Sequence, residues 1–409
     1  SYLQPISAIA PESGEEPFSI EEVFVSRTDK RGLIRSGNTV FRRVAGLEWN
    51  QMIGAPHRVI RNPDTPRAVF HLLWKTIRSG RPMVAYVKNR SANGNWYWVL
   101  AAVVPIKDGY LSGRIKPTSK LFASVRSLYA EISAAEKGQG LNPETSADLL
   151  LNRLSDLGFP DYLTFAVRAL EEELSLRDKA LGRANAEKTE ALNAIMTNLR
   201  ATIDQQTALM REFEALQSIP TNMRIIASRL EPTGGPISAI SDNYKFASAE
   251  ITRRLEAFAG SDSNLCKAMS EKVTEALLLS GIGRIMSDLP HQFTMEDTAQ
   301  MPVDVGQELE LLNTIQKAYS EAARTAIGRA DLIAAEMNQS SAEIRRMTLG
   351  LDTIRVMSRV ESGRLGPAGA GLSSTIDQLD QRHGEITRRL QQLMDISAAI
   401  RSGFSLYQG

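Results

Sequence analysis

The sequence predicts an α+β domain, an antiparallel sheet with flanking helices, followed by a mainly α-helical region that forms an antiparallel bundle or coiled coil. All four Trp residues lie between residues 49 and 98, in a segment whose short apolar runs are separated by turn residues. No convincing strand follows residue 121, and apolar residues there recur at helical spacing. The aromatic share of only 6% also favours long helices.

Within the first domain the predicted order is strand, strand, helices and three further strands. The helix at 67–78 is indicated by apolar residues three and four apart, and Asn93-Gly94 between two β-rich runs is typical of a hairpin. This order predicts a small antiparallel sheet with helices on one face. The expected elements are a strand at 23–25, a turn at 28–32, a strand at 33–34, the helix at 67–78, a strand at 83–87, a turn at 91–95 and a strand at 96–104.

The second region begins with an amphipathic helix from Leu121 to Ile132, and glycines with Asn142-Pro143 mark a break near 138–143. Residues 192–216 form a heptad seam of about four repeats, with Thr202 and Gln206 as its polar positions. Such a seam is buried against helices of the same chain or of a second copy. Because the seam offers a self-complementary face, we expect a homodimer.

An internal repeat organises the helical region. Ser228-Arg229-Leu230-Glu231 recurs as Ser358-Arg359-Val360-Glu361, and each copy precedes a turn rich in Gly and Pro. Each turn leads into a helix that contains Glu-Ile-Thr-Arg-Arg-Leu, at 250–255 and 385–390. The repeat predicts two helical hairpins with turns near residues 233 and 367.

Composition excludes several classes of protein. Lys and Arg number 48 and Asp and Glu 47, so the chain is not a general polyanion binder and we expect no nucleic-acid partner. A single cysteine, Cys266, excludes a disulfide framework and a multi-cysteine metal site. No apolar run approaches the roughly 18–20 residues of a membrane span, and no charged-then-apolar leader opens the chain. We therefore expect a cytoplasmic protein without a membrane span.

The run from Gly54 to Pro66, Gly-Ala-Pro-His-Arg-Val-Ile-Arg-Asn-Pro-Asp-Thr-Pro, resembles the PAS domain of bacterial aerotaxis receptors. One departure is Asn62, where that family usually has His. The resemblance covers roughly residues 20–120. It continues at Ala68, Phe70 and Trp74, in Val87-Lys88-Asn89-Arg90, at Asn93-Gly94, in Tyr97-Trp98-Val99 and at Val104-Pro105.

In that family the PAS cavity holds FAD, whose redox state reports respiratory electron flow. The resemblance implies that Trp74 can supply an aromatic wall and Arg61 a charged fork. His57 is a candidate ligand for a haem iron instead, and His71 is a second candidate. The positions that match the family's cofactor contacts are Asn38, Arg61, Asn62 in place of the His, Asp64, Phe70 and Trp74.

The two hairpins resemble the signalling hairpin of methyl-accepting chemotaxis proteins. Thr221-Asn222 with Glu231 matches one part of that family's motif, and residues 360–366 are a second partial match. Both copies depart from the motif, and the first has Pro232 directly after Glu231. The resemblance implies that a chemotaxis kinase and its coupling protein, or other signalling proteins, are candidate partners.

These patterns divide the chain into consecutive segments. They are a flexible tail (1–17), the PAS sensor domain (18–120), a helical linker or coiled coil (121–216), the first receptor-like hairpin (217–260), a helical connector (261–348) and the second receptor-like hairpin (349–409).

The prediction is a PAS-based redox or oxygen sensor and signal transducer that binds FAD and has no enzymatic activity, because no catalytic motif is present. The alternatives are a haem-binding PAS gas sensor and a cofactor-free scaffold. Phe70 and Trp74 are then core residues, and Arg61 pairs with Asp64 to hold a loop. We also expect Cys266 to be a small packed side chain and His383 to be partly exposed.

Overall fold

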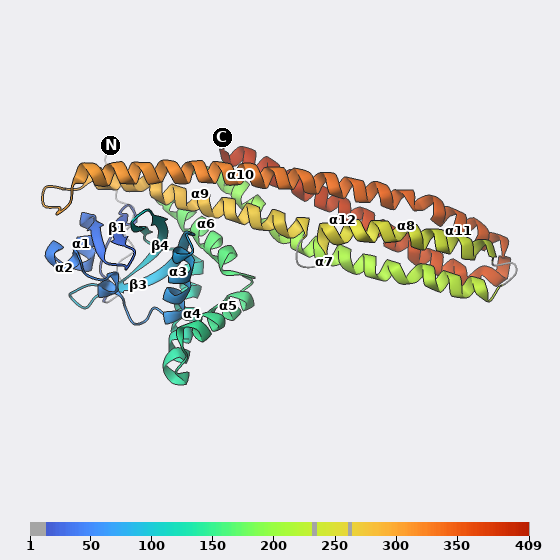
Figure 1. Ribbon diagram of the computed structural model, residues 1–409, viewed down its shortest axis with the longest axis horizontal. Coiled ribbons are helices and arrows are strands. Elements are labelled where there is room, and N and C mark those ends of the chain that lie inside the picture. Colours follow the sequence, from blue (N-terminus) through green and yellow to red (C-terminus); the bar gives the residue numbers. More distant parts are fainter. Residues whose placement is uncertain (1–13, 231–234, 261–263, 409) are drawn as a thin grey trace. The chain divides into compact units, whose positions relative to one another are not determined.

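A computed structural model describes residues 14–230, 235–260 and 264–408 (Figure 1). The chain forms two compact units rather than a series of consecutive segments. The first unit combines Ser1–Asn185 with Thr274–Thr325, and the second combines Ala186–Val273 with Ala326–Gly409. None of the helices in the described part of the chain is long and apolar enough to cross a membrane.

The first unit contains a five-stranded antiparallel sheet with the order β2-β1-β5-β4-β3. The predicted strands, the helix at 67–78 and the Asn93-Gly94 turn are all present, so the predicted fold class is confirmed. The strands are β1 (Phe24–Asp29), β2 (Ile34–Gly37), β3 (Met83–Arg90), β4 (Trp96–Ile106) and β5 (Gly109–Ile115), and the helices between β2 and β3 are α1 (Thr39–Ala45), α2 (Trp49–Met52), η1 (His57–Ile60) and α3 (Arg67–Arg78).

The end of the expected flexible tail is fixed to the sheet. Trp96 N donates to the Gly14 carbonyl at 2.8 Å, and Glu16 N donates to the Trp96 carbonyl at 2.7 Å. The Glu16 carboxylate also accepts from the side-chain amides of Asn93 and Asn95. The tail prediction is therefore wrong for residues 14–16, whose backbone pairs with β4, and residues 1–13 lie outside the described part of the chain.

Three helices follow the sheet: α4 (Lys120–Gln139), α5 (Pro143–Asp156) and α6 (Tyr162–Ala180). The predicted break near 138–143 is confirmed, because α4 ends at Gly140 with φ of 63° and the Asn142 side chain caps α5. On the face of the sheet away from α3, Phe122 of α4 packs against both Tyr86 and Trp98, with ring centroids 5.5 and 5.3 Å apart.

The same outer face is covered near β5 by a segment far away in sequence. α9 (Leu265–Met295) and α10 (Val305–Gly350) each contribute residues to both units, and their parts within 274–325 lie along the sheet (Figure 1). A Cβ at Gly113 of β5 would lie 2.9 Å from Ile285 Cγ2 and 3.2 Å from a Leu289 methyl. Both α9 side chains are buried, so this helix is part of the core of the domain.

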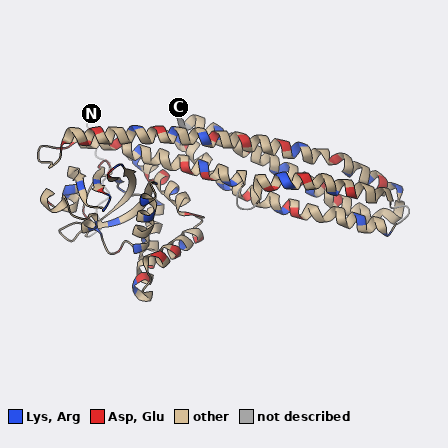
Figure 2. Ribbon diagram, in the orientation of Figure 1, with Lys and Arg blue, Asp and Glu red and all other residues tan. Residues whose placement is uncertain are grey.

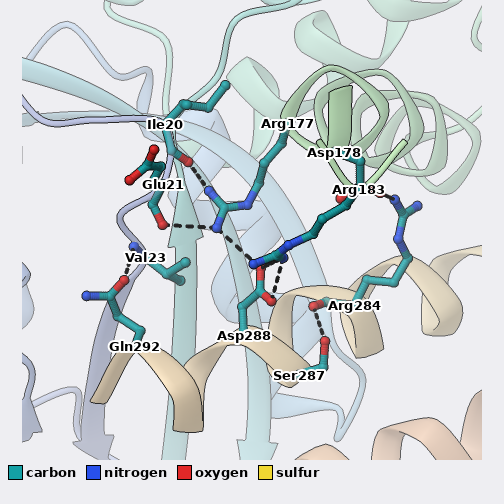
Figure 3. A network of polar contacts seen from close by, with 10 residues as sticks. All are labelled: Ile20, Glu21, Val23, Arg177, Asp178, Arg183, Arg284, Ser287, Asp288 and Gln292. Atoms are coloured by element: carbon teal, nitrogen blue, oxygen red, sulfur yellow. Dashed lines mark hydrogen bonds and ion pairs between the residues drawn. The ribbon is translucent and has the colours of Figure 1, made fainter. Parts of the chain in front are cut away.

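Polar contacts hold α9 and α10 in this position. Arg177 of α6 donates to the Glu21 carbonyl at 3.1 Å and to Asp288 of α9 at 3.2 Å (Figure 3). Val23 N donates to Gln292 of α9 at 3.3 Å. On β1, the Arg27 guanidinium binds both carboxylate oxygens of Glu308 in α10, with Nε 3.1 and 3.2 Å from them.

The second unit is helical, and charges of both signs are interspersed along its helices (Figure 2). α7 packs against α12 and α8, and most apolar positions of the predicted heptad seam are buried among them. The face on which we based the expectation of a homodimer is thus covered by helices of the same chain. The remaining elements are α7 (Ala186–Ser228), α8 (Gly235–Ala259), α11 (Asp352–Arg364), η2 (Gly366–Gly369) and α12 (Ala370–Gln408).

The predicted second hairpin is present, since α11 packs on α12 across the η2 turn. The predicted turn near residue 233 falls outside the described residues. The repeated hexapeptide has equivalent ion pairs in its two copies: Glu250 binds Arg253 and Arg254, and Glu385 binds Arg388 and Arg389. The two copies of the repeat therefore share a pattern of ion pairs as well as their sequence.

Two expectations about single residues of the second unit can be judged. Cys266 is buried as expected, and burial raises the pKa of its thiol to about 12. His383 is only 4% exposed, so the expectation of partial exposure is wrong. Its ring contacts the Tyr244 hydroxyl, and its Nδ1 lies 3.5 Å from the Asp352 carboxylate. These polar partners explain how an imidazole fits inside a helical bundle.

Candidate ligand-binding cavity

A cavity of about 370 Å³ lies between α3 and the inner face of the sheet. This volume is within the range of about 300–1,000 Å³ that is usual for small-molecule sites. Alternation along β4 turns Val99, Ala101 and Val103 toward the cavity. The three–four spacing of α3 places Phe70, Leu73, Trp74 and Ile77 on the opposite wall.

Trp74 is held at one end of the cavity by its neighbours. Its ring meets Tyr110 of β5 edge to face, with the ring centroids 5.6 Å apart. Gly32, in the turn between β1 and β2, has φ of 81°, and a Cβ there would lie 3.0 Å from the Trp74 ring. A glycine at this turn thus allows the indole to lie directly against the backbone.

The charged groups around the cavity are all cations. Arg31, Arg58, Arg61 and Arg114 line it, and no Asp or Glu is among the described residues that do so. Arg31 and Arg58 are exposed, whereas Arg114 is only 2% exposed. The cavity therefore combines apolar walls with positive charge at both its surface and its interior, which favours a ligand that is partly apolar and partly anionic.

Arg61 lies over an aromatic side chain of α3. Its Cζ is 3.5 Å from the centroid of the Phe70 ring, a cation–π contact. Its Nε is buried without a hydrogen-bond partner in the described structure. Burial, followed by the charge of Arg58, lowers the pKa of the guanidinium.

Arg114 of β5 is the most deeply buried cation of the cavity, and sequence reasoning missed it. Its Nη2 donates to Ser26 Oγ at 2.6 Å, and its guanidinium lies over Phe41, with Cζ 4.4 Å from the ring centroid. Nε and Nη1 are buried without a hydrogen-bond partner among the described residues. Burial lowers its pKa to about 10, so it stays charged at neutral pH. Strand alternation between Tyr110 and Arg114 was the signal that could have placed it on the inner face.

His57 lines the cavity beside Arg114. Its ring stacks on Phe41 with centroids 5.8 Å apart, and its Nε2 is 3.4 Å from Ser26 Oγ. Burial, with the charges of Arg114 and Arg61, lowers its pKa to about 3, so the ring is neutral at neutral pH. His71 is not a lining residue. No cluster of three or more His, Cys, Asp or Glu within the described ranges is arranged to hold a metal ion.

The structure brings four of the expected site residues together at the cavity: His57, Arg61, Phe70 and Trp74. It does not place Asn38 there. The Asn38 side chain caps α1, accepting from Phe41 N at 3.2 Å and from Val25 N at 2.9 Å. Its amide donates to the Val23 carbonyl and to Glu296. All of its hydrogen bonds therefore go to the scaffold.

Asn62 and Asp64 are also not among the lining residues. Asn62 Oδ1 accepts from Asp64 N at 2.9 Å, which forms a local turn. The Asp64 carboxylate, 56% exposed, pairs with Lys88 at 2.7 Å. The alternative in which Arg61 and Asp64 pair to hold a loop is therefore wrong, because Asp64 has a different partner and Arg61 lies on Phe70.

The sheet order, the helices α1 to α3 on one face and the cavity between them define a PAS domain within the first unit, and residues 36–112 match the family model described as PAS fold. Among curated proteins, the aerotaxis receptor of Escherichia coli (strain K12) is 34% identical over 131 residues, which cover 31% of this chain and 26% of the receptor. The nitrogen fixation regulatory protein of Klebsiella pneumoniae is 27% identical over 84 residues, or 20% of this chain and 17% of that protein. The chain thus matches only about a quarter of the length of the receptor.

Two solved structures resemble part of the chain. The PAS domain of a protein from Colwellia psychrerythraea is 20% identical, with a TM-score of 0.21, and covers 23% of this chain and 85% of its own. The light state of the blue-light photoreceptor Aureochrome1 LOV is 17% identical, with a TM-score of 0.24, and covers 27% of this chain and 91% of its own.

Proposed function

We propose that this protein is a PAS-based redox or oxygen sensor and signal transducer that binds FAD in the cavity of its first unit. The observation that carries the proposal is an apolar cavity whose charged lining residues are all arginines, two of which, Arg61 and Arg114, have buried nitrogens without a hydrogen-bond partner among the described residues. The resemblance to aerotaxis receptors, which implies FAD, supports the same ligand. A cytoplasmic location is part of the proposal.

The residues at the cavity suit a flavin ring in their chemistry. A planar ring system needs apolar walls, which Leu73, Trp74 and Val99 provide. FAD is larger than the enclosed volume, so its anionic diphosphate belongs at the surface, near the exposed Arg31 and Arg58. When bound, a flavin supplies reversible uptake of electrons, which changes the charge and protonation of the ring.

We propose that the sheet carries the state of the cavity to α9 and α10. Ser26 and Arg114 face the cavity, while their chain neighbours Arg27 and Gly113 meet α10 and α9. Because both helices continue into the second unit, a small shift of either one changes residues of both units. A free-energy difference of about 1–3 kcal/mol between two helix positions is sufficient for such coupling. The helix that leaves the sheet, α4, is a second route, and Glu173 binds the two residues directly before it, Thr118 and Ser119.

An absorption spectrum of freshly purified protein tests the proposed ligand. The expected result is a flavin spectrum, either directly or after FAD is added and excess ligand is removed, and its loss on chemical reduction. The matched variants are Trp74→Ala, which removes a cavity wall, and Trp49→Ala, which alters a tryptophan that does not line the cavity. Wild-type protein that retains no flavin under these conditions contradicts the proposal.

Haem is the second candidate ligand, because His57 lines the cavity and its neutral ring can bind a metal. A Soret band that disappears in His57→Ala supports haem, whereas a flavin spectrum in that variant excludes it. If neither ligand is retained, the cofactor-free scaffold becomes the better proposal.

The partners are part of the proposal as well. A chemotaxis kinase with its coupling protein is one candidate, and a second copy of the chain is another. A homodimer needs a face other than the seam of α7, which is buried within the chain. Sedimentation of the purified protein measures its oligomeric state, and reconstitution with purified kinase and coupling protein measures the interaction directly.

A further inference from the structure

The Arg114 guanidinium has more hydrogen-bond donors than the protein satisfies. Only Nη2 has a partner, Ser26, while Nε and Nη1 are buried and unpaired in the described structure. No carboxylate faces it from the lining residues. Burying a cation without a counter-charge is costly, and such groups are normally paired. The arrangement is therefore incomplete without an acceptor that comes from outside the protein.

We infer that Arg114 is the residue that orients the ligand, by donating from Nε and Nη1 to an acceptor-rich edge of its planar ring. This inference rests on the proposed function and adds which end of the ligand lies inside. For a flavin, the inner edge is that of the pyrimidine ring, which carries two carbonyl oxygens, rather than the dimethylbenzene edge, which carries no acceptor.

The surroundings of Arg114 favour a ring edge over a phosphate. Phe24 and Phe41 lie beneath its guanidinium, with Cζ 5.6 and 4.4 Å from their centroids. Tyr97, stacked on Phe24, is fully buried as well. A phosphate would bring nearly two negative charges, more than the single Arg114 cation neutralises, into this apolar region, whereas carbonyl oxygens bring none. The exposed Arg58 can bind phosphate at the surface with a much smaller desolvation cost.

The inference therefore assigns the ring of the ligand to the buried Arg114 and its phosphate to the exposed Arg58. Three ligands distinguish these two roles. Riboflavin has the ring without a phosphate, FMN adds one phosphate and FAD adds a diphosphate with adenosine. The experiment titrates each ligand into full-length ligand-free protein and measures Kd by quenching of flavin fluorescence. It compares wild type with Arg114→Gln, Arg114→Lys and Arg58→Gln.

The expected result is that Arg114→Gln weakens all three ligands by the same factor, about 10- to 100-fold, because the lost hydrogen bonds reach the shared ring. Arg114→Lys restores part of the affinity. Arg58→Gln weakens FMN and FAD while riboflavin affinity stays unchanged. The Arg114 variants also shift the flavin absorption bands relative to wild type, and Arg58→Gln does not.

Three results overturn the inference. Unchanged affinities in folded Arg114→Gln show that this residue does not bind the ligand, although the proposed function then stands. A loss confined to FMN and FAD shows that Arg114 binds phosphate and that the ligand lies the other way round. Wild-type protein that binds none of the three overturns the proposed function and this inference together. If circular dichroism shows that Arg114→Gln does not fold, Arg114→Lys provides the test alone. An equal loss of affinity for riboflavin and FAD then supports the inference, and a loss for FAD only overturns it.

Discussion

Gly113 and Arg114 are consecutive residues of β5 that serve opposite faces of the sheet. Arg114 lines the cavity, and a Cβ at Gly113 would lie 2.9 Å from Ile285 Cγ2 in α9. A movement of this strand that adjusts the guanidinium to a ligand must therefore also move the backbone against α9. Because α9 lies here without an intervening side chain from β5, the cavity and the helix are separated by the thickness of one strand.

The first prediction concerns this close approach. Replacing Gly113 with Val places a branched side chain against Ile285 and Leu289, and overpacking of this kind typically costs about 1–3 kcal/mol. We expect a lower free energy of unfolding in urea and faster hydrogen exchange in residues 280–295. The control is Gly138→Ala in α4, where the added Cβ meets nothing within 4 Å beyond the adjacent backbone of its own helix and stability should be equal or higher. Exchange that remains slow in G113V would mean that α9 does not depend on this contact.

The second prediction concerns Arg27 and Glu308, which join β1 to α10. The side chains are 25% and 10% exposed, and the contact is bidentate. A double-mutant cycle with Arg27→Gln and Glu308→Gln should give a coupling free energy of about 1–2 kcal/mol, since partly buried, forked pairs exceed exposed ones.

The control cycle uses Arg153 and Glu131, whose side chains are 46% and 51% exposed. Its coupling should lie between about 0 and 1 kcal/mol. Equal coupling in the two cycles would show that the Arg27 pair contributes no more than an ordinary surface pair, and that α10 is held to the sheet by other contacts.

Much of the first unit could be predicted because its signals are local. Pro66 and the three–four spacing after it define α3 at 67–78, and Asn93-Gly94 defines the turn of the β3–β4 hairpin. Nothing local connects Gly113 with Ile285, since the complementarity of a glycine in a strand and a branched side chain in a helix 172 positions later appears only in three dimensions. The interleaving of residues 274–325 with the first unit was missed for this reason.

Some residues of the candidate site could be predicted from local sequence signals, and others could not. His57, Arg61, Phe70 and Trp74 lie in or just after the motif that resembles aerotaxis receptors, and the structure places all of them on the cavity. Their role in binding a cofactor stays a prediction. Arg114 lies beyond the quoted motifs. Strand alternation could have placed it on the inner face, but its burial with Nε and Nη1 unpaired among the described residues is apparent only in three dimensions.

The third prediction concerns Glu136 of α4, which caps the cavity helix α3. Its carboxylate accepts from the backbone N–H groups of Arg67 and Ala68, each at 3.1 Å, and from Ser146 Oγ. Pro66, at the N-cap position of α3, has no side-chain acceptor, so Glu136 supplies this function from another helix.

Replacing Glu136 with Ala should therefore lower the free energy of unfolding by about 1–2 kcal/mol, the usual effect of losing a cap. Because Phe70 and Trp74 lie on the helix that loses its cap, FAD affinity should fall as well. Glu131→Ala, at an exposed position of the same helix, serves as the control. It should change stability by no more than the about 0–1 kcal/mol of an exposed ion pair and should leave FAD affinity unchanged. A variant E136A that keeps wild-type stability would show that water replaces the cap.

The last prediction concerns pH and a buried carboxyl of α6. Glu171 is 8% exposed, its Oε1 has no hydrogen-bond partner in the described structure, and burial raises its pKa to about 7. The groups that act on it are the cations Arg284 and Arg168, which lower the pKa, and Asp178, which raises it. An acid whose pKa is higher in the folded state than the usual 4.5 takes up a proton on folding. Its contribution to stability is complete below pH 4.5 and is lost as pH rises through 7.

Glu171→Gln keeps the shape of the side chain and removes the titration. We therefore expect this variant to be more stable than wild type at pH 8, with a difference that shrinks as pH falls and disappears near pH 4.5. Urea unfolding at pH 5, 6, 7 and 8 measures the difference directly. Glu172→Gln is the matched control, because its carboxylate is more exposed and pairs with Arg168 at 2.8 Å. A stability difference between E171Q and wild type that is the same at every pH would show that Glu171 does not titrate in this range, and that its charge is compensated by Arg284 and Arg168.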